Sequence, residues 1–352
     1  IVSEGEQPLD QLLSHLKENK PLNTVPNLIY LEENKVIRNP KSEALPYDQL
    51  VCPTFDQLPL EKYLMPYPVL PYMSSRGCYW GKCTFCTHSF IYDSHYRKEN
   101  EVRVAEELDH LSKKYKTKYF TFSDEAISPN AFNRMSKEIL KRSVDMRALG
   151  MLKFESSEKE SPELFDDIYR AGFLMLFFGL ESANDRILSI IDKGCDQETE
   201  KAVLQHSSEA GIWNHLYLFF GFPTEERSEA EDTIQFTIEN SEVESGIIHS
   251  VGQSIFALEK DSAIYHNPAK FKIDRIVQDP ERDMAIVFDY EINTGMPREE
   301  VMDVYENFNS VIEKHFPSRQ IWNYLSREHF LLYLDHYGKE EILNMASTGV
   351  AP

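Results

Sequence analysis

The sequence predicts an α/β fold: a partial (β/α)6 TIM-like barrel with a short N-terminal remnant and a mostly helical C-terminal region. Short apolar segments alternate with amphipathic segments about six times between residues 69 and 256. This alternation favours parallel strands that are joined by helical crossovers. No glycine-rich phosphate turn follows the first apolar segment, so a barrel fits better than a doubly wound sheet.

The expected strands are apolar or aromatic, and they cover residues 69–75, 118–123, 146–154, 174–180, 215–222 and 247–256. The fourth, LMLFFGL, is continuously apolar, as in a strand that is buried on both faces. Between the strands, apolar residues recur at helical spacing: Val104, Leu108 and Leu111 share one face. Ser161 followed by Pro162 is typical of a helix start.

Three regions follow from this pattern: residues 1–68, 69–262 and 263–352. The first contains a hairpin-like stretch, NLIYLEENKVIRN, and a proline-rich connector. The last is expected to be mostly helical, with Pro297 near the start of a long helix. The chain opens on IVSEGEQPLDQLL, which looks like the end of a strand, a turn and a helix, so we expect a fragment of a longer protein.

Charge and hydropathy limit the partners that the chain can have. A net charge of −21 opposes binding to a nucleic-acid backbone, and no dense block of Lys and Arg offsets it. The most apolar run, 173–180, is too short to span a bilayer, and no signal peptide opens the chain. We therefore expect a cytoplasmic protein without nucleic-acid or membrane partners.

Three of the five cysteines, Cys78, Cys83 and Cys86, lie in GCYWGKCTFC, directly after the first expected strand. In a reducing compartment, such a group is more often a set of metal ligands than a disulfide framework. Three thiolates can hold three irons of a [4Fe–4S] cluster and leave the fourth iron open. Two alternatives remain: a zinc site completed by His88 or His95, and an electron-transfer cluster, for which no fourth cysteine is close.

The phrase SSRGCYWGKCTFC resembles the cluster loop of the radical S-adenosylmethionine (radical SAM) enzymes, with one extra residue between the first two cysteines. Three further segments resemble that family and occur in its order: TFSDEA at 121–126, FFGLESANDRILSIIDKG at 177–194 and LYLFFGFPTEERSE at 216–229. The resemblance implies an enzyme that reductively cleaves S-adenosylmethionine (SAM) at a [4Fe–4S] cluster and starts radical chemistry. It also implies a small-molecule or peptide substrate, and a reductant such as flavodoxin or ferredoxin.

By this resemblance, the three cysteines ligate the cluster, and a set of residues surrounds SAM: Phe85, Ser123, Asp124, Glu125, Glu181 and Ser182. Glu125 is expected at the amino group of the methionine portion, and Glu181 near the ribose or methionine, because carboxylates accept hydrogen bonds from both. The backbone around Phe85 is expected at the adenine. Cys52 and Cys195 are expected to be incidental thiols.

The N-terminal stretch resembles the junction in cobalamin-binding members of the family, in which a Rossmann-like domain precedes the barrel. Cobalamin-dependent methyl transfer or rearrangement is therefore expected of the full-length protein. The cobalamin signature Asp-x-His-x-x-Gly is absent, and DHYG at 335–338 has the wrong spacing. Two other functions stay open: a methylthiotransferase, which needs a second cluster, and a zinc-stabilised binding protein without turnover.

Overall fold

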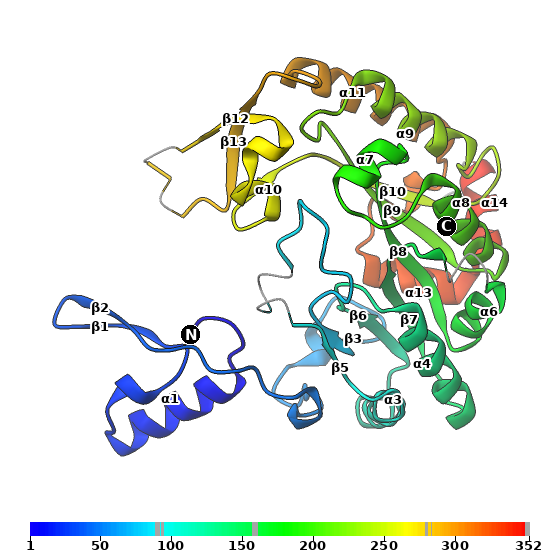
Figure 1. The fold of residues 1–352 in the computed structure, drawn as a ribbon. Helices are drawn as coiled ribbons and strands as arrows, with labels where there is room; N and C mark the ends of the chain where they lie inside the picture. Colours follow the sequence, from blue (N-terminus) through cyan, green and yellow to red (C-terminus); the bar gives the residue numbers. More distant parts are fainter. Residues whose placement is uncertain (89–91, 93–94, 157–160, 279–280, 283, 349–352) are drawn as a thin grey trace.

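A computed structural model describes residues 1–352 except 89–91, 93–94, 157–160, 279–280, 283 and 349–352. Its centre is a six-stranded parallel sheet in the order β10-β9-β8-β7-β6-β3 (Figure 1). The strands are β3 (Val69–Tyr72), β6 (Tyr119–Phe122), β7 (Arg147–Leu152), β8 (Phe173–Glu181), β9 (Trp213–Phe220) and β10 (Ser250–Ile255). Each strand pairs in parallel with the next along the chain, which confirms the predicted partial (β/α)6 barrel.

Helices follow the strands and enclose the outer face of the sheet (Figure 1). They are α3 (Glu101–Tyr115), α4 (Pro129–Arg142), α6 (Pro162–Arg170), α7 (Asp185–Ile190), α8 (Gln197–Glu209), α9 (Arg227–Glu239) and α11 (Arg298–His315). Local chemistry sets their starts, since the side chains of Asn100, Ser128 and Asp196 each accept a hydrogen bond from a backbone N–H of the first turn.

The strand β8 is buried on both faces, as its apolar sequence predicts. Leu176 and Phe178 face the outer helices, whereas Met175 and Phe177 face inward and belong to a second apolar cluster. Inside the curve of the sheet, three C-terminal helices complete that cluster: α12 (Arg319–Trp322), α13 (Arg327–Tyr337) and α14 (Lys339–Thr348). The part of the barrel interior that faces these three helices is therefore filled with packed side chains.

Asp335, the first residue of DHYG, fixes α13 to the sheet. Its carboxylate pairs with Lys118 at 2.8 Å and with Arg147 at 2.7 Å, and it accepts a hydrogen bond from the Tyr119 hydroxyl at 2.8 Å. These three partners lie on or next to β6 and β7, and they account for Asp335 as a structural residue.

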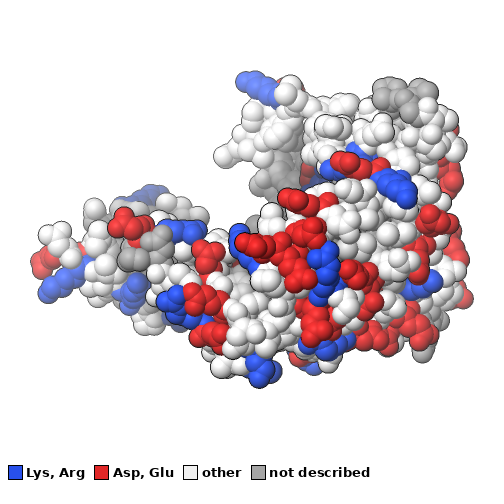
Figure 2. All heavy atoms as spheres, turned by 90° about the horizontal axis from the view of Figure 1, so that it is seen from above, with Lys and Arg blue, Asp and Glu red and all other residues white. Residues whose placement is uncertain are grey.

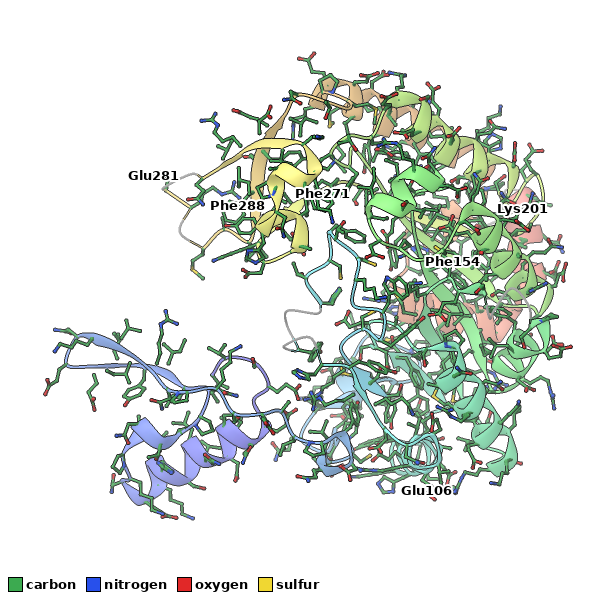
Figure 3. The ribbon with its side chains drawn as sticks, viewed as in Figure 1. Glu106, Phe154, Lys201, Phe271, Glu281 and Phe288 are labelled. Carbon is green, nitrogen blue, oxygen red and sulfur yellow. The ribbon has the colours of Figure 1, made fainter. Side chains whose placement is uncertain are left out.

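The C-terminal region also contains a small antiparallel sheet that the sequence analysis did not anticipate. Its order is β11-β13-β12, with β11 (Leu258–Glu259), β12 (Ile273–Val277) and β13 (Val287–Ile292). The short helices α10 (Ala263–His266) and η4 (Pro268–Phe271) lie beside it. Figure 3 labels Phe271 and Phe288 here, and the Phe271 ring packs 6.1 Å from that of Phe222, which anchors this sheet to the barrel.

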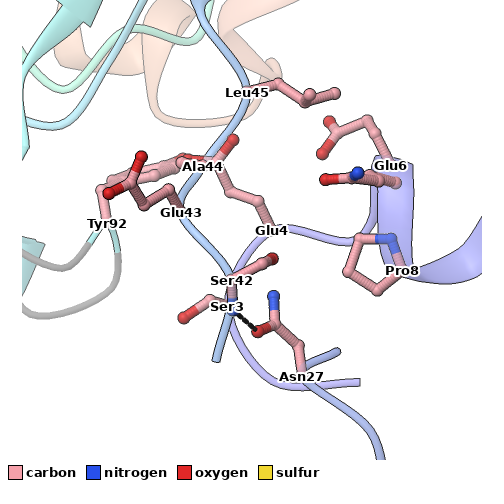
Figure 4. Close-up of a pocket in the computed structure, with 11 residues that line it drawn as sticks. Ser3, Glu4, Glu6, Pro8, Asn27, Ser42, Glu43, Ala44, Leu45 and Tyr92 are labelled. Carbon is pink, nitrogen blue, oxygen red and sulfur yellow. Dashed lines mark hydrogen bonds between the residues drawn. The ribbon is translucent and has the colours of Figure 1, made fainter. Parts of the chain in front are cut away.

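The N-terminal region consists of α1 (Glu6–Glu18), the predicted hairpin β1 (Ile29–Glu32) and β2 (Lys35–Arg38), and the turns η1 (Leu22–Thr24), η2 (Tyr47–Gln49) and η3 (Leu60–Lys62). The first five residues form no strand, contrary to expectation. They run past a pocket in which the backbone N–H of Ser42 donates to the Asn27 side chain at 2.8 Å (Figure 4).

Ion pairs join this N-terminal region to the barrel. Glu4 pairs with both Arg76 and Arg97, and Glu6 pairs with Arg76 at 2.5 Å. Both arginines belong to the hairpin of β4 (Ser75–Arg76) and β5 (Arg97–Lys98), which frames the cysteine loop, defined here as residues 77–96. The two glutamates therefore connect the N-terminal region to the base of that loop.

Acidic side chains are spread over the barrel surface among scattered Lys and Arg residues (Figure 2). Within the ranges that the structure describes, no helix combines the length and the apolar character that crossing a membrane requires.

Candidate active site

The cysteine loop lies at the carboxyl end of the parallel strands, where barrel sites form. Gly77 starts the loop with φ +76°, and a Cβ there would lie 2.9 Å from the His95 carbonyl oxygen, so glycine is required. Thr84 fixes the loop's centre: its N–H donates to Ile191 O at 2.9 Å, and its carbonyl accepts from Ile264 N at 2.9 Å. The loop is thereby held between α7 and α10.

Cys78, Cys83 and Cys86 line one cavity of about 400 Å³. All three thiols are free and partly buried, and burial raises the pKa of Cys83 and raises that of Cys86 to about 12. Thiols in such surroundings become thiolates when a metal or a cation compensates their charge. Three free sulfurs that converge on one cavity fit a cluster held at three corners.

Of the two histidines considered for zinc, only His88 lines the cavity with the cysteines. Nδ1 of His88 is engaged by Glu125, and His95 does not line the cavity. In the described part of the chain, no three or more His, Cys, Asp or Glu side chains are grouped as ligands of a metal ion. A [4Fe–4S] cluster does not require ligands grouped around one point. Its ligand sulfurs bind separate irons and therefore lie further apart than the ligands of a single ion.

Glu125 lines the cavity and faces the cysteine loop. Its Oε2 lies 2.9 Å from Nδ1 of His88, and this hydrogen bond raises the pKa of His88. The carboxylate is therefore already placed to accept from a cationic donor.

Glu181 also lines the cavity, at the end of β8, and it has a left-handed backbone with φ +62° beside a bulge in the strand pairing. Its Oε1 lies 3.0 Å from Nζ of Lys193, which is 6% exposed. Burial alone would lower the pKa of Lys193, but Glu181 and the Cys83 thiol together hold it above its usual value. Sequence reasoning missed Lys193, although it lies in the IIDKG segment that carried the resemblance.

Two other implied residues, Asp124 and Ser182, are buried outside the cavity. Asp124 accepts hydrogen bonds from Ser74 N at 3.0 Å, Ser74 Oγ at 2.7 Å and Ser75 Oγ at 2.6 Å. It holds the segment that leads into Cys78. The Ser182 hydroxyl lies 3.1 Å from that of Thr233, so it connects the end of β8 to α9.

Of the implied residues Ser123 and Phe85, only Phe85 lines the cysteine cavity. Ser123 lines a different cavity on the far side of the strand, and its hydroxyl donates to the Tyr72 carbonyl at 3.2 Å. Phe85 lines the cysteine cavity, where its ring meets that of Phe219 edge-on at 5.1 Å. The structure thus brings together Phe85, Glu125, Glu181 and the three cysteines.

The remaining cysteines do not join this group. Cys52 packs against the outer core, where burial raises its thiol pKa to about 11. The Cys195 sulfur lies 3.7 Å from Oε1 of the buried Glu200, and burial followed by the Glu200 charge raises the pKa of Cys195. Neither residue lines the cysteine cavity.

Trp80, in the cysteine loop, lies directly against Gly194. Its Nε1 donates to the Asp192 carbonyl at 2.7 Å, and a Cβ on Gly194 would meet the indole at 2.2 Å. We expect Gly194→Ala to lower the free energy of unfolding by about 2–4 kcal/mol, because it adds a clash to the strain of a positive φ. Urea titration measures this difference.

Gly246→Ala is the matched control for that prediction. Gly246 also has a positive φ, +68°, against +74° at Gly194, but nothing lies within 4 Å of its added Cβ. Gly246→Ala is expected to lower the free energy of unfolding by about 1–2 kcal/mol. Equal losses in the two variants would show that the contact between Trp80 and Gly194 is unimportant.

The Gly-Phe-Pro turn after β9 is structural in character. Gly221 donates its N–H to Glu225 Oε2 at 2.5 Å, and its backbone lies against Val301, which a Cβ would approach to 2.7 Å. Glu225 is 1% exposed, and burial raises its pKa from 4.5 to about 7. None of these residues lines the cysteine cavity.

Glu225 makes stability depend on pH. Its folded pKa is raised, so the folded state holds the proton more tightly, and stability falls as pH rises from 4.5 to about 7. The free energy of unfolding of the wild-type protein should fall by an amount on the order of a few kcal/mol across this pH range. In Glu225→Gln this fall should be absent. Urea unfolding at several pH values measures it, with the exposed Glu231→Gln as control. A wild-type slope in the Glu225→Gln variant would contradict this account.

The sequence of the barrel matches a known family. The family model of the Radical SAM superfamily matches residues 72–237, which include the cysteine loop, Glu125, Glu181 and Lys193. The barrel of this chain, over residues 72–237, belongs to the radical SAM superfamily. This family implies a [4Fe–4S] cluster and SAM as cofactors.

Two curated relatives are methyltransferases by name. An uncharacterized methyltransferase of Pyrococcus horikoshii is 28% identical over 242 residues, which are 67% of this chain and 51% of that protein. The bacteriochlorophyllide d C-12(1)-methyltransferase of Chlorobaculum tepidum is 27% identical over 177 residues, which are 49% of this chain and 38% of that protein. The chain therefore spans about half the length, or less, of these two relatives.

Two solved radical SAM structures share the fold. The cobalamin-dependent enzyme OxsB matches with a TM-score of 0.69 and 16% identity, over 98% of this chain and 62% of that chain. The methyltransferase TsrM from Kitasatospora setae matches with a TM-score of 0.68 and 15% identity, over 99% of this chain and 76% of that chain.

Proposed function

We propose that this barrel binds SAM in the cysteine cavity and cleaves it reductively. The observation that carries the proposal is that one cavity at the carboxyl end of the sheet is lined by Cys78, Cys83, Cys86, Glu125 and Glu181. When bound, a [4Fe–4S] cluster supplies one electron to the sulfonium of SAM, which breaks a carbon–sulfur bond and yields a 5′-deoxyadenosyl radical. Cys78, Cys83 and Cys86 would hold that cluster, and three ligands would leave its fourth iron free to bind SAM.

The charged side chains of the cavity match the two charged ends of an amino acid. Glu125 accepts hydrogen bonds from the ammonium of the methionine portion, in exchange for its present partner His88. Lys193 lies beside Glu181, so this corner offers both a cation and an anion. We assign Lys193 to the carboxylate of the methionine portion, and Glu181 to the ribose hydroxyls or the methionine.

Apolar side chains close the cavity around these groups. Phe85 and Phe219 meet edge-on, and Met151 and Phe256 also line the wall. They exclude water from the place where the radical forms, which limits side reactions. Phe85 is at the end of the cavity assigned to adenine.

Asp124, Ser123 and Ser182 support this site without lining it. Asp124 orients the entry to the cysteine loop through Ser74 and Ser75. Ser123 bonds to the β3 backbone, and Ser182 to α9. We therefore propose a positioning role for these three residues in place of direct SAM contact.

We further propose cobalamin-dependent methyl transfer as the activity of the protein to which this chain belongs. Both curated relatives are named methyltransferases, and two cobalamin enzymes match nearly the whole chain in fold. The N-terminal helix supports this proposal: Leu9, Leu13 and Leu16 recur on one face of α1 and are 48%, 58% and 56% exposed, as expected of a face that packs against further protein.

Anaerobic reconstitution tests the proposal. The protein is expected to bind about four irons and four sulfides per chain, and SAM is expected to change the electron paramagnetic resonance (EPR) spectrum of the reduced cluster. Stoichiometric zinc in a colourless protein would contradict it. For the cobalamin proposal, full-length protein purified with hydroxocobalamin should retain about one cobalamin per chain by absorbance, and loss of the cobalamin on gel filtration would oppose it.

A further inference from the structure

Lys153 is a buried cation for which the structure shows no anion. It directly follows β7, lines the cysteine cavity and is 5% exposed, next to Phe154, which Figure 3 labels. Its Nζ donates to the Phe154 carbonyl at 2.9 Å and lies 4.3 Å from the centre of the Trp80 ring. Neither contact carries a negative charge, and within the described residues Lys153 makes no ion pair with a carboxylate. A buried ammonium without an anion is costly.

Lys193 provides a comparison within the same cavity. It is equally buried, but its Nζ lies 3.0 Å from the Glu181 carboxylate. Burial lowers the pKa of Lys153, and the weaker influences of Cys195, Glu155 and Cys83 do not reverse it, whereas Lys193 keeps a raised pKa. Among the residues that the structure describes, one lysine of the cavity thus has a carboxylate partner, and the other does not.

Trp80 holds Lys153 in this position. Lys82 Nζ also lies 4.4 Å from the centre of the indole ring, and the Asp192 carbonyl and Gly194 contact the ring as well. The attraction between a cation and an aromatic face offsets only part of the cost of burying the charge. An anion that binds in the cavity would supply the missing compensation.

We propose that Lys153 is the counter-charge of the cysteine-bound cluster and favours its reduced form. This inference rests on the proposed function, since it requires Cys78, Cys83 and Cys86 to bind the cluster as thiolates. Reduction by one electron, supplied by dithionite or a flavodoxin-type donor, adds one negative charge to that assembly. A fixed ammonium in a low-dielectric cavity stabilises the more negative state, so Lys153 makes the reduction potential less negative.

The test compares midpoint potentials of the reconstituted protein, measured by EPR during potentiometric titration without SAM. Lys153→Met removes the charge and keeps the length of the side chain, Lys153→Arg keeps the charge, and Lys201→Met removes one charge from the surface. In K153M the ratio of reduced to oxidised cluster at a fixed potential is expected to fall about tenfold, which is about 59 mV for one electron. K153R and K201M should match the wild type.

An unchanged potential in K153M, with a cluster that forms normally, would overturn this inference and leave the proposed function intact. Weaker SAM binding in K153M together with an unchanged potential would overturn it too, because the partner anion would then be the carboxylate of SAM. A wild-type protein that forms no cluster would contradict both proposals. If K153M folds by circular dichroism but takes up no cluster while K153R does, the requirement for the cation is supported directly.

Discussion

Cys83→Ala is expected to abolish the cluster. Cys83 lies at the centre of the cysteine loop and lines the same cavity as Cys78 and Cys86, so its loss leaves two sulfurs for an assembly that needs three. Iron and sulfide per chain should fall from about four each to near zero after reconstitution. SAM cleavage should fall at least about a hundredfold, to the background of the assay.

Cys52→Ala is the matched control. Cys52 is another partly buried free thiol, but it packs against the outer core and does not line the cavity. It should keep full iron content and full cleavage. If both alanine variants kept the wild-type iron content, the assignment of Cys83 as a ligand would be wrong.

Asp124→Ala is expected to destabilise the protein and to disorder the entry to the cysteine loop. The carboxylate is 4% exposed and accepts three hydrogen bonds from Ser74 and Ser75, and these donors would lose their partner. Burial raises the pKa of Asp124 against the effect of these hydrogen bonds, so part of the loss is offset when a buried charge is removed. The expected net loss is about 2–4 kcal/mol of unfolding free energy in urea titration.

Asp109→Ala serves as the control for Asp124. Asp109 is an acid on the surface of α3 that pairs with Lys113 at 2.5 Å, with side chains 41% and 75% exposed, so its removal should cost less than about 1 kcal/mol. Asp124→Ala should also lower cluster content relative to Asp109→Ala. If the two variants had the same stability and the same cluster content, Asp124 would have no positioning role.

The barrel could be predicted because its signals are local. Each strand is a run of apolar residues, and each helix shows its own periodicity and caps, so six repeats of strand and helix leave few topologies. The small sheet of β12 and β13 lacks long apolar runs, although VFDYEI at 287–292 alternates apolar and polar residues as a half-buried strand does. Its strand β13 alternates exposed and half-buried positions, and its burial depends on contact with the barrel.

The site could be predicted only in part. The spacing of the cysteines and the positions of Glu125 and Glu181 at strand ends identify residues that do line the cavity. Ser123 and Asp124 are neighbours of Glu125, and side chains that follow one another at a strand end point in different directions. Which of the three faces the cavity depends on how the chain turns after β6, and the sequence does not specify this.

The two cavity lysines show the other limit. In the sequence, Lys153 and Lys193 look like surface residues, because lysine is rarely buried without a partner. They become cavity residues only when the cysteine loop with Trp80 folds over them from a distant part of the chain. Such tertiary contacts cannot be read from spacing or periodicity.

The most direct test is to measure 5′-deoxyadenosine by mass spectrometry after the reconstituted protein is mixed with SAM and dithionite under anaerobic conditions. The account predicts 5′-deoxyadenosine and methionine in equal amounts from the wild-type protein and neither from Cys83→Ala. A wild-type protein that carries its full cluster yet leaves SAM intact under reduction would contradict it.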